Sequence, residues 1–271
     1  MQRLNALSRQ PGKYLSILQI QVLNRLVYPL DLALQSLTIV MFMWIFMQLW
    51  RTTYNASGQQ AISGLTLNQT MWYLMIAEAI MLSMPRPSRT ISTAVKDGSI
   101  AYFLNKPFDF MLYQLAALLG EYLIRILFNL LAGGIIVWLM VGPPPVLSAL
   151  PLVLVSMVLG WLISFCLSAL IGLSAFVVEE VSAFEWVYSK FLLLLGGVLI
   201  PLDFLPAWLQ KISLALPFAY SIYGPARLFV TPSLERFAML TLGQLAWLAG
   251  CGILLLVFYR RGLARLAING G

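Results

Sequence analysis

Apolar positions along this chain fall in long blocks that are separated by short polar or proline-containing segments. Each block approaches the length that a helix needs to cross a bilayer, which is about 20 residues. The pattern predicts an all-α, polytopic membrane protein with a single transmembrane domain over residues 1–271. The six predicted membrane spans are residues 31–50, 67–84, 110–140, 149–178, 183–200 and 237–259.

Residues 14–28 precede the first block and show a modest amphipathic pattern. Most polar side chains fall away from one apolar stripe at helical spacing, which consists of Leu15, Leu18, Val22 and Leu26. A helix with one apolar face typically lies in the membrane interface and does not cross the bilayer. We therefore expect a surface helix here.

Residues 201–232 are as apolar as a span, but four prolines interrupt them: Pro201, Pro206, Pro217 and Pro225. No unbroken helix of span length fits between these prolines. Irregular backbone at membrane depth is tolerated only where protein buries it or where it lines a cavity. The segment therefore predicts a short re-entrant helical hairpin on the outer side, with Trp208 and Tyr220 at the interface. An ordinary outer loop with an interfacial helix is the alternative.

Only 10% of the residues are charged, and the net charge is +7, whereas soluble domains carry about 25% charged residues. The basic residues cluster between the apolar blocks, mostly on one side. By the positive-inside rule, this bias predicts that both termini are cytoplasmic. A basic stripe with interleaved aromatic residues is missing, so we expect no nucleic-acid partner. The chain contains no histidine, which excludes histidine chemistry and histidine metal ligands, and we expect no metal site.

The sequence offers little for catalysis. The only Gly-Lys pair, Gly12-Lys13, lacks the rest of the phosphate-binding loop G-x-x-x-x-G-K-[ST], so we expect this chain to bind no cofactor and to hold no catalytic residue. Glu78 is the one carboxylate deep inside a predicted span, where a charge costs ~2.5–3.5 kcal/mol on insertion scales. We interpret it as a structural interhelical contact or, alternatively, as a proton or cation site. Glu121 and Arg125, four residues apart on one helix face, are interpreted as a structural pair.

A compact charged insert, residues 94–107, separates the second and third predicted spans. Its sequence predicts a short helix over residues 99–104 that carries Tyr102 and Phe103 and is bounded by Gly98 and Pro107. A charged insert between spans is usually a solvated loop. Here the aromatic pair and the rigid ends favour a docking element, because aromatic anchors supply much of the energy of protein interfaces.

These features together resemble the membrane subunit of a type-2 ATP-binding-cassette (ABC) exporter over nearly the whole chain. Three local patterns carry the resemblance: the insert VKDGSIAYFLNKPFDFMLYQLA, the outer segment GGVLIPLDFLPAWLQKISLALPFAYSIYGPARLFV and the basic, glycine-ended terminus YRRGLARLAINGG. The second and third patterns are similar to a bacterial branch of two-component drug or viologen exporters. The resemblance implies a permease of the bacterial cytoplasmic (inner) membrane, surrounded by membrane lipids.

In that family the insert is a cytoplasmic coupling helix that docks into a cleft on a separate ATPase subunit. The resemblance therefore assigns ATPase docking to Lys96, Asp97, Gly98, Ser99, Tyr102, Phe103, Lys106 and Pro107. It also implies an outer gate formed by the hairpin residues Pro201, Phe204, Pro206, Trp208, Pro217 and Tyr220. ATP and Mg²⁺ would be bound by a dimer of ATPase subunits. A second permease subunit, identical or a sister, would complete a pathway along the dimer interface near the second and fifth spans.

An apolar and aromatic pathway predicts an amphipathic or lipid-like small molecule as the exported cargo. Two alternatives stand beside the ABC interpretation. An ion-coupled secondary transporter would use Glu78 as its ionisable site inside the membrane. A channel or a non-transporting membrane assembly factor would have no stoichiometric ATPase partner.

Overall fold

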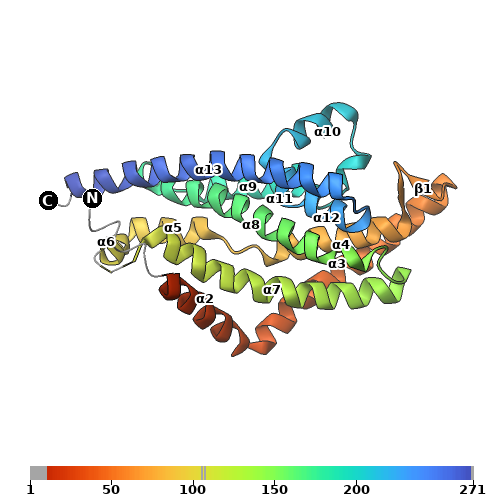
Figure 1. Ribbon diagram of the computed structural model, residues 1–271, viewed down its shortest axis with the longest axis horizontal. Helices are drawn as coiled ribbons and strands as arrows, with labels where there is room; N and C mark the ends of the chain where they lie inside the picture. Colours follow the sequence, from red (N-terminus) through yellow and green to blue (C-terminus); the bar gives the residue numbers. More distant parts are fainter. Residues whose placement is uncertain (1–10, 105, 107, 270–271) are drawn as a thin grey trace.

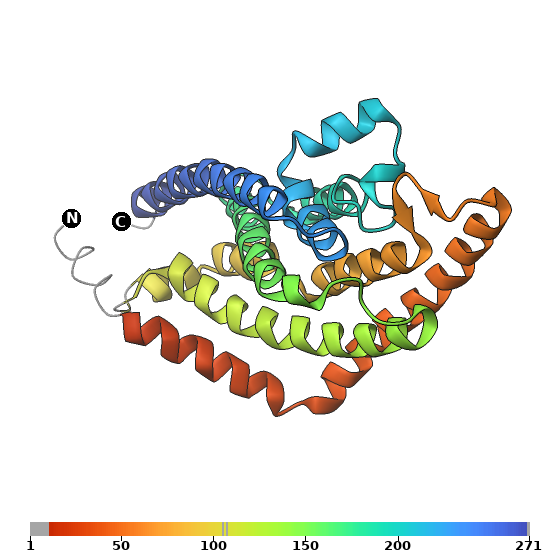
Figure 2. The ribbon, with the colours of Figure 1, turned by 45° about the vertical axis from the view of Figure 1, so that its right-hand side comes forward.

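The computed structural model describes residues 11–104, 106 and 108–269, which are almost entirely α-helical (Figure 1 and Figure 2). The elements, in chain order, are α2 (Pro11–Leu26), α3 (Pro29–Ser57), β1 (Ala61–Ile62), β2 (Leu65–Thr66), α4 (Leu67–Ser83), α5 (Pro87–Lys96), α6 (Ser99–Leu104), α7 (Phe110–Val141), α8 (Leu150–Leu173), α9 (Ser182–Leu195), α10 (Ala207–Leu214), α11 (Pro217–Ser221), α12 (Tyr223–Val230) and α13 (Leu234–Asn269). This arrangement confirms the predicted all-α class.

Within the described residues, four helices are long and apolar enough to cross a membrane: Pro29–Ser57, Phe110–Val141, Leu147–Phe176 and Leu234–Ala264. The two other predicted spans correspond to shorter helices, since α4 has 17 residues and α9 has 14. Helix α9 stops at Leu195, before the predicted end of its span, because Gly197 takes a left-handed φ of 72°. The chain is thus a multi-pass membrane protein, and the six-span topology stays a prediction.

The long helices run roughly along the longest axis of the molecule, so its two ends differ in content (Figure 1). The start of α2, the short helix α6 and the end of α13 lie at one end, and the hairpin of β1 and β2 lies at the opposite end. Helix α10 projects from the side of the bundle in the half that carries β1. The predicted docking segment and the predicted outer hairpin therefore occupy opposite halves of the molecule.

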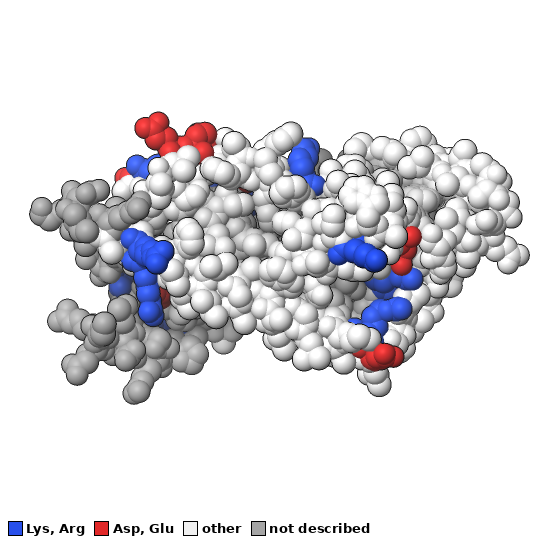
Figure 3. Space-filling view, turned by 90° about the horizontal axis from the view of Figure 1, so that it is seen from above, with Lys and Arg blue, Asp and Glu red and all other residues white. Residues whose placement is uncertain are grey.

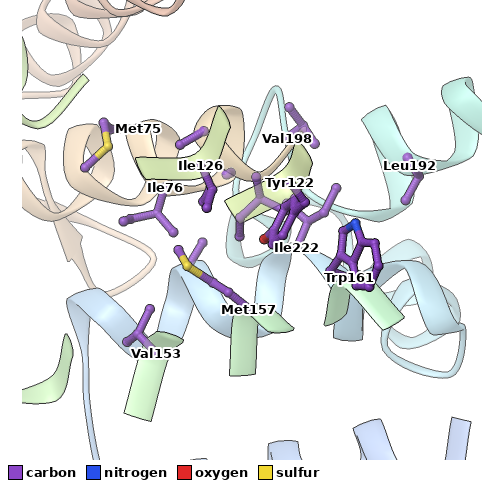
Figure 4. Close-up of a cluster of buried hydrophobic side chains, with 14 of the residues drawn as sticks. Met75, Ile76, Tyr122, Ile126, Val153, Met157, Trp161, Leu192, Val198 and Ile222 are labelled. Carbon is purple, nitrogen blue, oxygen red and sulfur yellow. The ribbon is translucent and has the colours of Figure 1, made fainter. Parts of the chain in front are cut away.

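Helix α4 forms the centre of the bundle. A capping box of Thr66 and Gln69 begins it, and every residue from Thr70 to Ile80 is buried between α3, α7 and α12. Figure 4 shows part of this core, where side chains of α4, α7 and α8 meet in one cluster. Tyr122 stacks there on Trp161, with 5.5 Å between the ring centroids. The core is thus continuous along the bundle, and the long helices packed around it connect the α6 end of the molecule with the β1 end.

The predicted surface helix α2 lies against α7. A Cβ added to Gly120 would lie 2.7 Å from the Leu18 carbonyl oxygen, so glycine is what permits this close approach. The Tyr14 hydroxyl accepts a hydrogen bond from the Asp109 N–H at 3.0 Å. Within the predicted apolar stripe, Leu15 and Leu26 are exposed whereas Leu18 and Val22 are partly buried; exposed apolar side chains are expected on a helix in the membrane interface.

Residues 201–232 form three short helices and no helix of span length, as the prolines predict. Pro217 occupies the first turn of α11, where a proline is tolerated. Helix α10 stands away from the bundle (Figure 2), whereas α11 and α12 pack on α8 and α4. A Cβ added to Gly160 would lie 2.7 Å from the Ser221 carbonyl oxygen, so α8 and α11 approach each other almost backbone to backbone.

Candidate functional site

The predicted ATPase-docking segment, residues 94–107, contains the end of helix α5, a sharp turn and the short helix α6, and it lies at one end of the molecule (Figure 1). Helix α5 ends at the exposed Lys96, and Gly98 takes a left-handed φ of 74°. The Asp97 carboxylate accepts a hydrogen bond from the Ser99 N–H at 2.9 Å, and hydrogen bonding to Ser99 lowers the pKa of Asp97. Pro107, the other predicted end of the segment, lies outside the described residues.

The two predicted aromatic anchors have different environments. Tyr102 is 64% exposed, and Nζ of Lys106 lies 4.2 Å from its ring centroid. Phe103 packs instead among the rings at the start of α7, with centroid distances of 5.4 Å to Phe110 and 5.5 Å to Tyr113. Phe103 therefore packs α6 against α7, whereas the Tyr102 side chain lies at the surface.

Ion pairs join α5 to the start of α9 and to the residues just before it. Arg89 Nε lies 2.9 Å from the Glu185 carboxylate, and Arg86 lies 3.6 Å from the same group. Lys96 Nζ lies 3.6 Å from the Glu180 carboxylate. These pairs were not predicted from the sequence. The basic residues near α5 and the acidic turn before α9 were the features that could have suggested them. Because the pairs start from the helix that leads into α6, they connect α6 with α9.

A second group of charges lies between α2 and α7. Arg125 and Glu121 are 2.7 Å apart, which confirms the predicted structural pair. Arg25 of α2 also bonds the Glu121 carboxylate, and it lies 3.9 Å from Asp31. Sequence spacing predicted the pair within α7 but not the arginine that α2 adds to it.

A cavity of about 520 Å³ lies where α4, α5, α7, α8 and α9 meet, beside both groups of charges. We call it the inner cavity. Its charged lining residues are Arg86, Arg89, Glu121, Arg125 and Glu185. Its aromatic lining residues are Trp161, Phe165 and Tyr188. A wall that combines charged and hydroxyl groups with apolar and aromatic side chains is suited to a small molecule with both a polar and an apolar part.

The predicted gate residues lie in the half of the molecule that contains α10. The Phe204 ring lies 5.0 Å from the Trp50 ring of α3, and the Tyr220 carbonyl accepts a hydrogen bond from the Gln244 side chain at 2.9 Å. Trp208, on α10, is 64% exposed. Of the predicted gate prolines, Pro201 and Pro217 are buried and Pro206 is exposed. These residues are thus spread along residues 201–220, where Phe204 contacts α3 and Tyr220 contacts α13.

An ion pair that was not predicted from the sequence joins the two ends of the segment formed by residues 201–232. Arg227 Nε lies 3.2 Å from Asp203, and the Tyr223 hydroxyl donates a hydrogen bond to the same carboxylate at 3.3 Å. All three residues line a second cavity of about 490 Å³ beside the start of α13. Asp203 is separated from Tyr223 and Arg227 by an irregular segment, so sequence periodicity could not predict that these residues meet.

Glu78 is 3% exposed at the centre of α4. Across the described ranges, no side chain or backbone group forms a hydrogen bond or an ion pair with its carboxyl group. It also lies apart from the charge groups at the two ends. Among the described residues, no three histidine, cysteine, aspartate or glutamate side chains lie close enough together to form a metal site.

Long apolar helices around a buried central helix, with few charged side chains on the face seen in Figure 3, define a multi-pass helical membrane protein. A family model described as ABC-2 family transporter protein matches residues 39–270. The chain therefore belongs to this family, as its resemblance to a type-2 ABC permease predicted, and it is a membrane subunit and not a catalytic one. A comparison with curated protein sequences gave no match.

Proposed function

We propose that this chain is the permease subunit of an exporter that moves an amphipathic or lipid-like small molecule with ATP hydrolysed by a separate subunit. The observation that carries the proposal is Tyr102, an exposed aromatic side chain on a short helix at the end of an ABC-2 family bundle. Phe103 anchors that helix in the protein, so Tyr102 is held ready for a partner. ATP and Mg²⁺ belong to the ATPase dimer, and this chain supplies no cofactor site.

We assign the α6 end of the molecule to the cytoplasmic side of the bacterial inner membrane. In this topology α4 and α9 cross the membrane together with the four longer helices, which gives six spans and two cytoplasmic termini. The positive-inside rule supports the assignment. The basic side chains toward the α6 end include Arg86, Arg89, Lys96, Lys106, Arg260 and Arg261.

A second permease subunit, identical or a sister, would complete the pathway. Large apolar side chains exposed on α3 and α9, such as Trp44 and Trp186, support a partner bundle or lipid at these faces. In the opposite half, Phe204, Trp208 and Tyr220 would close the outer gate. ATP-driven closure of the ATPase subunits would displace α6, and the ion pairs of Arg89 and Lys96 would pass the displacement to α9.

Affinity purification from the native membrane in mild detergent tests the proposal. We expect mass spectrometry to identify an ATPase with a phosphate-binding loop in the wild-type sample. Truncating an aromatic anchor at the centre of an interface costs about 2 kcal/mol or more, so Tyr102→Ala should lower recovery of the ATPase by about thirtyfold. Trp208→Ala is the matched control, because Trp208 is equally exposed, at 64%, but lies in the opposite half. Equal recovery from both variants, or no ATPase from the wild type, would overturn the proposal.

Ion-coupled transport is a second candidate function, and one observation favours it. Glu78 is a buried carboxyl group without an ion pair or hydrogen bond among the described residues, and ionisable groups inside a membrane often mark ion pathways. This mechanism needs no ATPase partner. The same purification therefore separates the two candidates.

A further inference from the structure

The inner cavity carries an excess of positive charge. In each of its two charge groups, one carboxylate is shared by two guanidinium groups. The groups are Arg86–Glu185–Arg89 and Arg25–Glu121–Arg125. Three of these arginines and the two glutamates line the inner cavity, while Arg25 lies outside the lining and is also paired with Asp31, which leaves a net charge of +1 at one end of the cavity. A bound anion would balance this charge.

Three polar atoms in the wall of the inner cavity have no hydrogen-bond partner within the described part of the chain. They are Ser88 Oγ, Ser164 Oγ and Arg125 Nε. Ser88 is 1% exposed and Ser164 is 5% exposed. Buried polar groups in native proteins are nearly always satisfied by protein, water or ligand. Because all three atoms can donate a hydrogen bond, the missing partner is rich in acceptors.

Apart from Thr90, Ser168 and Ser189, the rest of the wall is apolar or aromatic. Trp161 is 2% exposed, and its ring lies 5.7 Å from the Phe165 ring. Met81 and Leu192 extend the apolar surface toward α4 and α9. The cavity volume of about 520 Å³ is within the range of small-molecule sites. A ligand that fills it would therefore join an anionic head to an apolar body.

Another cavity adjoins the inner cavity on the side of α6. It has a volume of about 560 Å³, borders α2, α5, α6 and α7, and includes Asp97 and Ser99 of the docking segment. The two cavities share the lining residues Arg89, Thr90, Leu118 and Glu121. A molecule that passed between them from the α6 end would meet the charged groups first and the aromatic wall afterwards.

We infer that the inner cavity binds a phosphate-headed amphiphile, with its phosphate at Arg125 and Ser164 and its apolar body against Trp161. Guanidinium groups bind phosphate through paired hydrogen bonds. A phosphate monoester carries between about 1.5 and 2 negative charges at pH 7, so the excess of arginines over glutamates in the lining attracts it. This inference rests on the proposed function, since it names the substrate class of the exporter.

Equilibrium binding of radiolabelled oleoyl-lysophosphatidic acid to the purified permease in mild detergent, without ATPase, tests the inference. We expect saturable binding at one site per chain. Arg125→Gln should weaken it by about tenfold, because a charge-assisted hydrogen bond is lost. Ser164→Ala, which removes one hydroxyl and leaves the ion pairs intact, should weaken it by about threefold. Arg51→Gln, at an exposed position on α3, is the matched control and should change nothing.

Two further probes identify the ligand chemistry. Mono-oleoylglycerol has the same chain without the phosphate, and we expect no saturable binding of it. Inorganic phosphate has the anion without the chain, and we expect it to displace the label only weakly. Equal binding of mono-oleoylglycerol, or full displacement by inorganic phosphate, would overturn the assignment of a phosphate-headed amphiphile. Unchanged affinity in both Arg125→Gln and Ser164→Ala would overturn the location.

The outcomes for this site and for the proposed function are distinguishable. If lysophosphatidic acid does not bind but the ATPase still co-purifies, only the inference about the cavity fails. If it binds with the expected variant pattern but no ATPase co-purifies, the binding site stands and the ABC exporter function fails.

Discussion

The short helices in the two halves of the molecule are held in different ways. Helix α6 is attached through the Phe103 ring and through α5, whose arginines are mostly exposed where they meet Glu185: the side chain of Arg86 is 60% exposed and that of Arg89 is 64% exposed. In the hairpin, the Asp203 and Arg227 side chains are only 16% and 14% exposed. The arginines that connect α5 with α9 are therefore more solvated than the arginine of the Asp203–Arg227 pair, although Ile100 and Phe103 of α6 pack in or against the core.

This difference indicates which contacts can rearrange more easily. Elements that move are drawn from regions with few buried contacts and many exposed ones. By this criterion the solvated ion pairs between α5 and α9 can rearrange more easily than the buried pair of Asp203 and Arg227. The hairpin, packed on α4 and α8, is instead part of the structure against which such a movement would act.

Replacing one acid by its amide at each end gives the largest expected contrast. Asp203→Asn should lower the free energy of unfolding by about 2–3 kcal/mol, because it leaves the mostly buried Arg227 without its counter-ion. Glu185→Gln should cost less than about 1 kcal/mol, because water can solvate its exposed arginine partners. Unfolding by SDS titration in mixed micelles measures both values. Equal costs would show that the two ends are held alike.

A glycine substitution sharpens the comparison with a somewhat smaller effect. A side chain at Gly160 meets the Ser221 backbone, which belongs to the hairpin and cannot easily shift. We expect Gly160→Val to destabilise the protein by about 1–3 kcal/mol through overpacking. Gly252→Val, in the long helix α13, is the matched control, because a Cβ there meets nothing within 4 Å. The melting temperature of each variant in the same detergent gives the comparison, and equal values would contradict the close packing of α8 on α11.

Much of the fold could be predicted because it depends on local pattern. The apolar blocks gave the helical membrane class, and the prolines near residue 85 and in the hairpin marked helix breaks that the structure contains. The pair of Glu121 and Arg125 followed from spacing within one helix. Each of these features is determined by residues that are close together in the sequence.

The candidate site was harder to predict because it depends on distant residues. Sequence periodicity carries no information about which helix packs against which. The addition of Arg25 to Glu121 and the pairing of Arg89 with Glu185 both join residues 96 positions apart. The same limit applies to Tyr102 and Phe103, which look equivalent in the sequence but acquire opposite roles once Phe103 meets the rings of α7.

The smallest effect on stability is expected for a substitution of Glu78, which lies in the middle of α4, between the two ends compared above. The amide of Glu78→Gln has nearly the shape of a carboxyl group, and no ion pair or hydrogen bond of Glu78 within the described residues would be lost. We expect stability within about 0.5 kcal/mol of the wild type. ATP-dependent uptake of a labelled amphiphile into inverted membrane vesicles should also stay unchanged.

Glu121→Gln provides the contrast for this measurement, because it removes a carboxylate that Arg25 and Arg125 share, and it should be clearly less stable. If Glu78 were an ion-coupling site, its charge would have to appear and disappear during each cycle, and the amide cannot do this. Uptake driven by a proton gradient would then persist without ATP in the wild type and would be lost in Glu78→Gln. That result would assign the work of transport to the centre of the bundle and would leave α6 without a mechanical role.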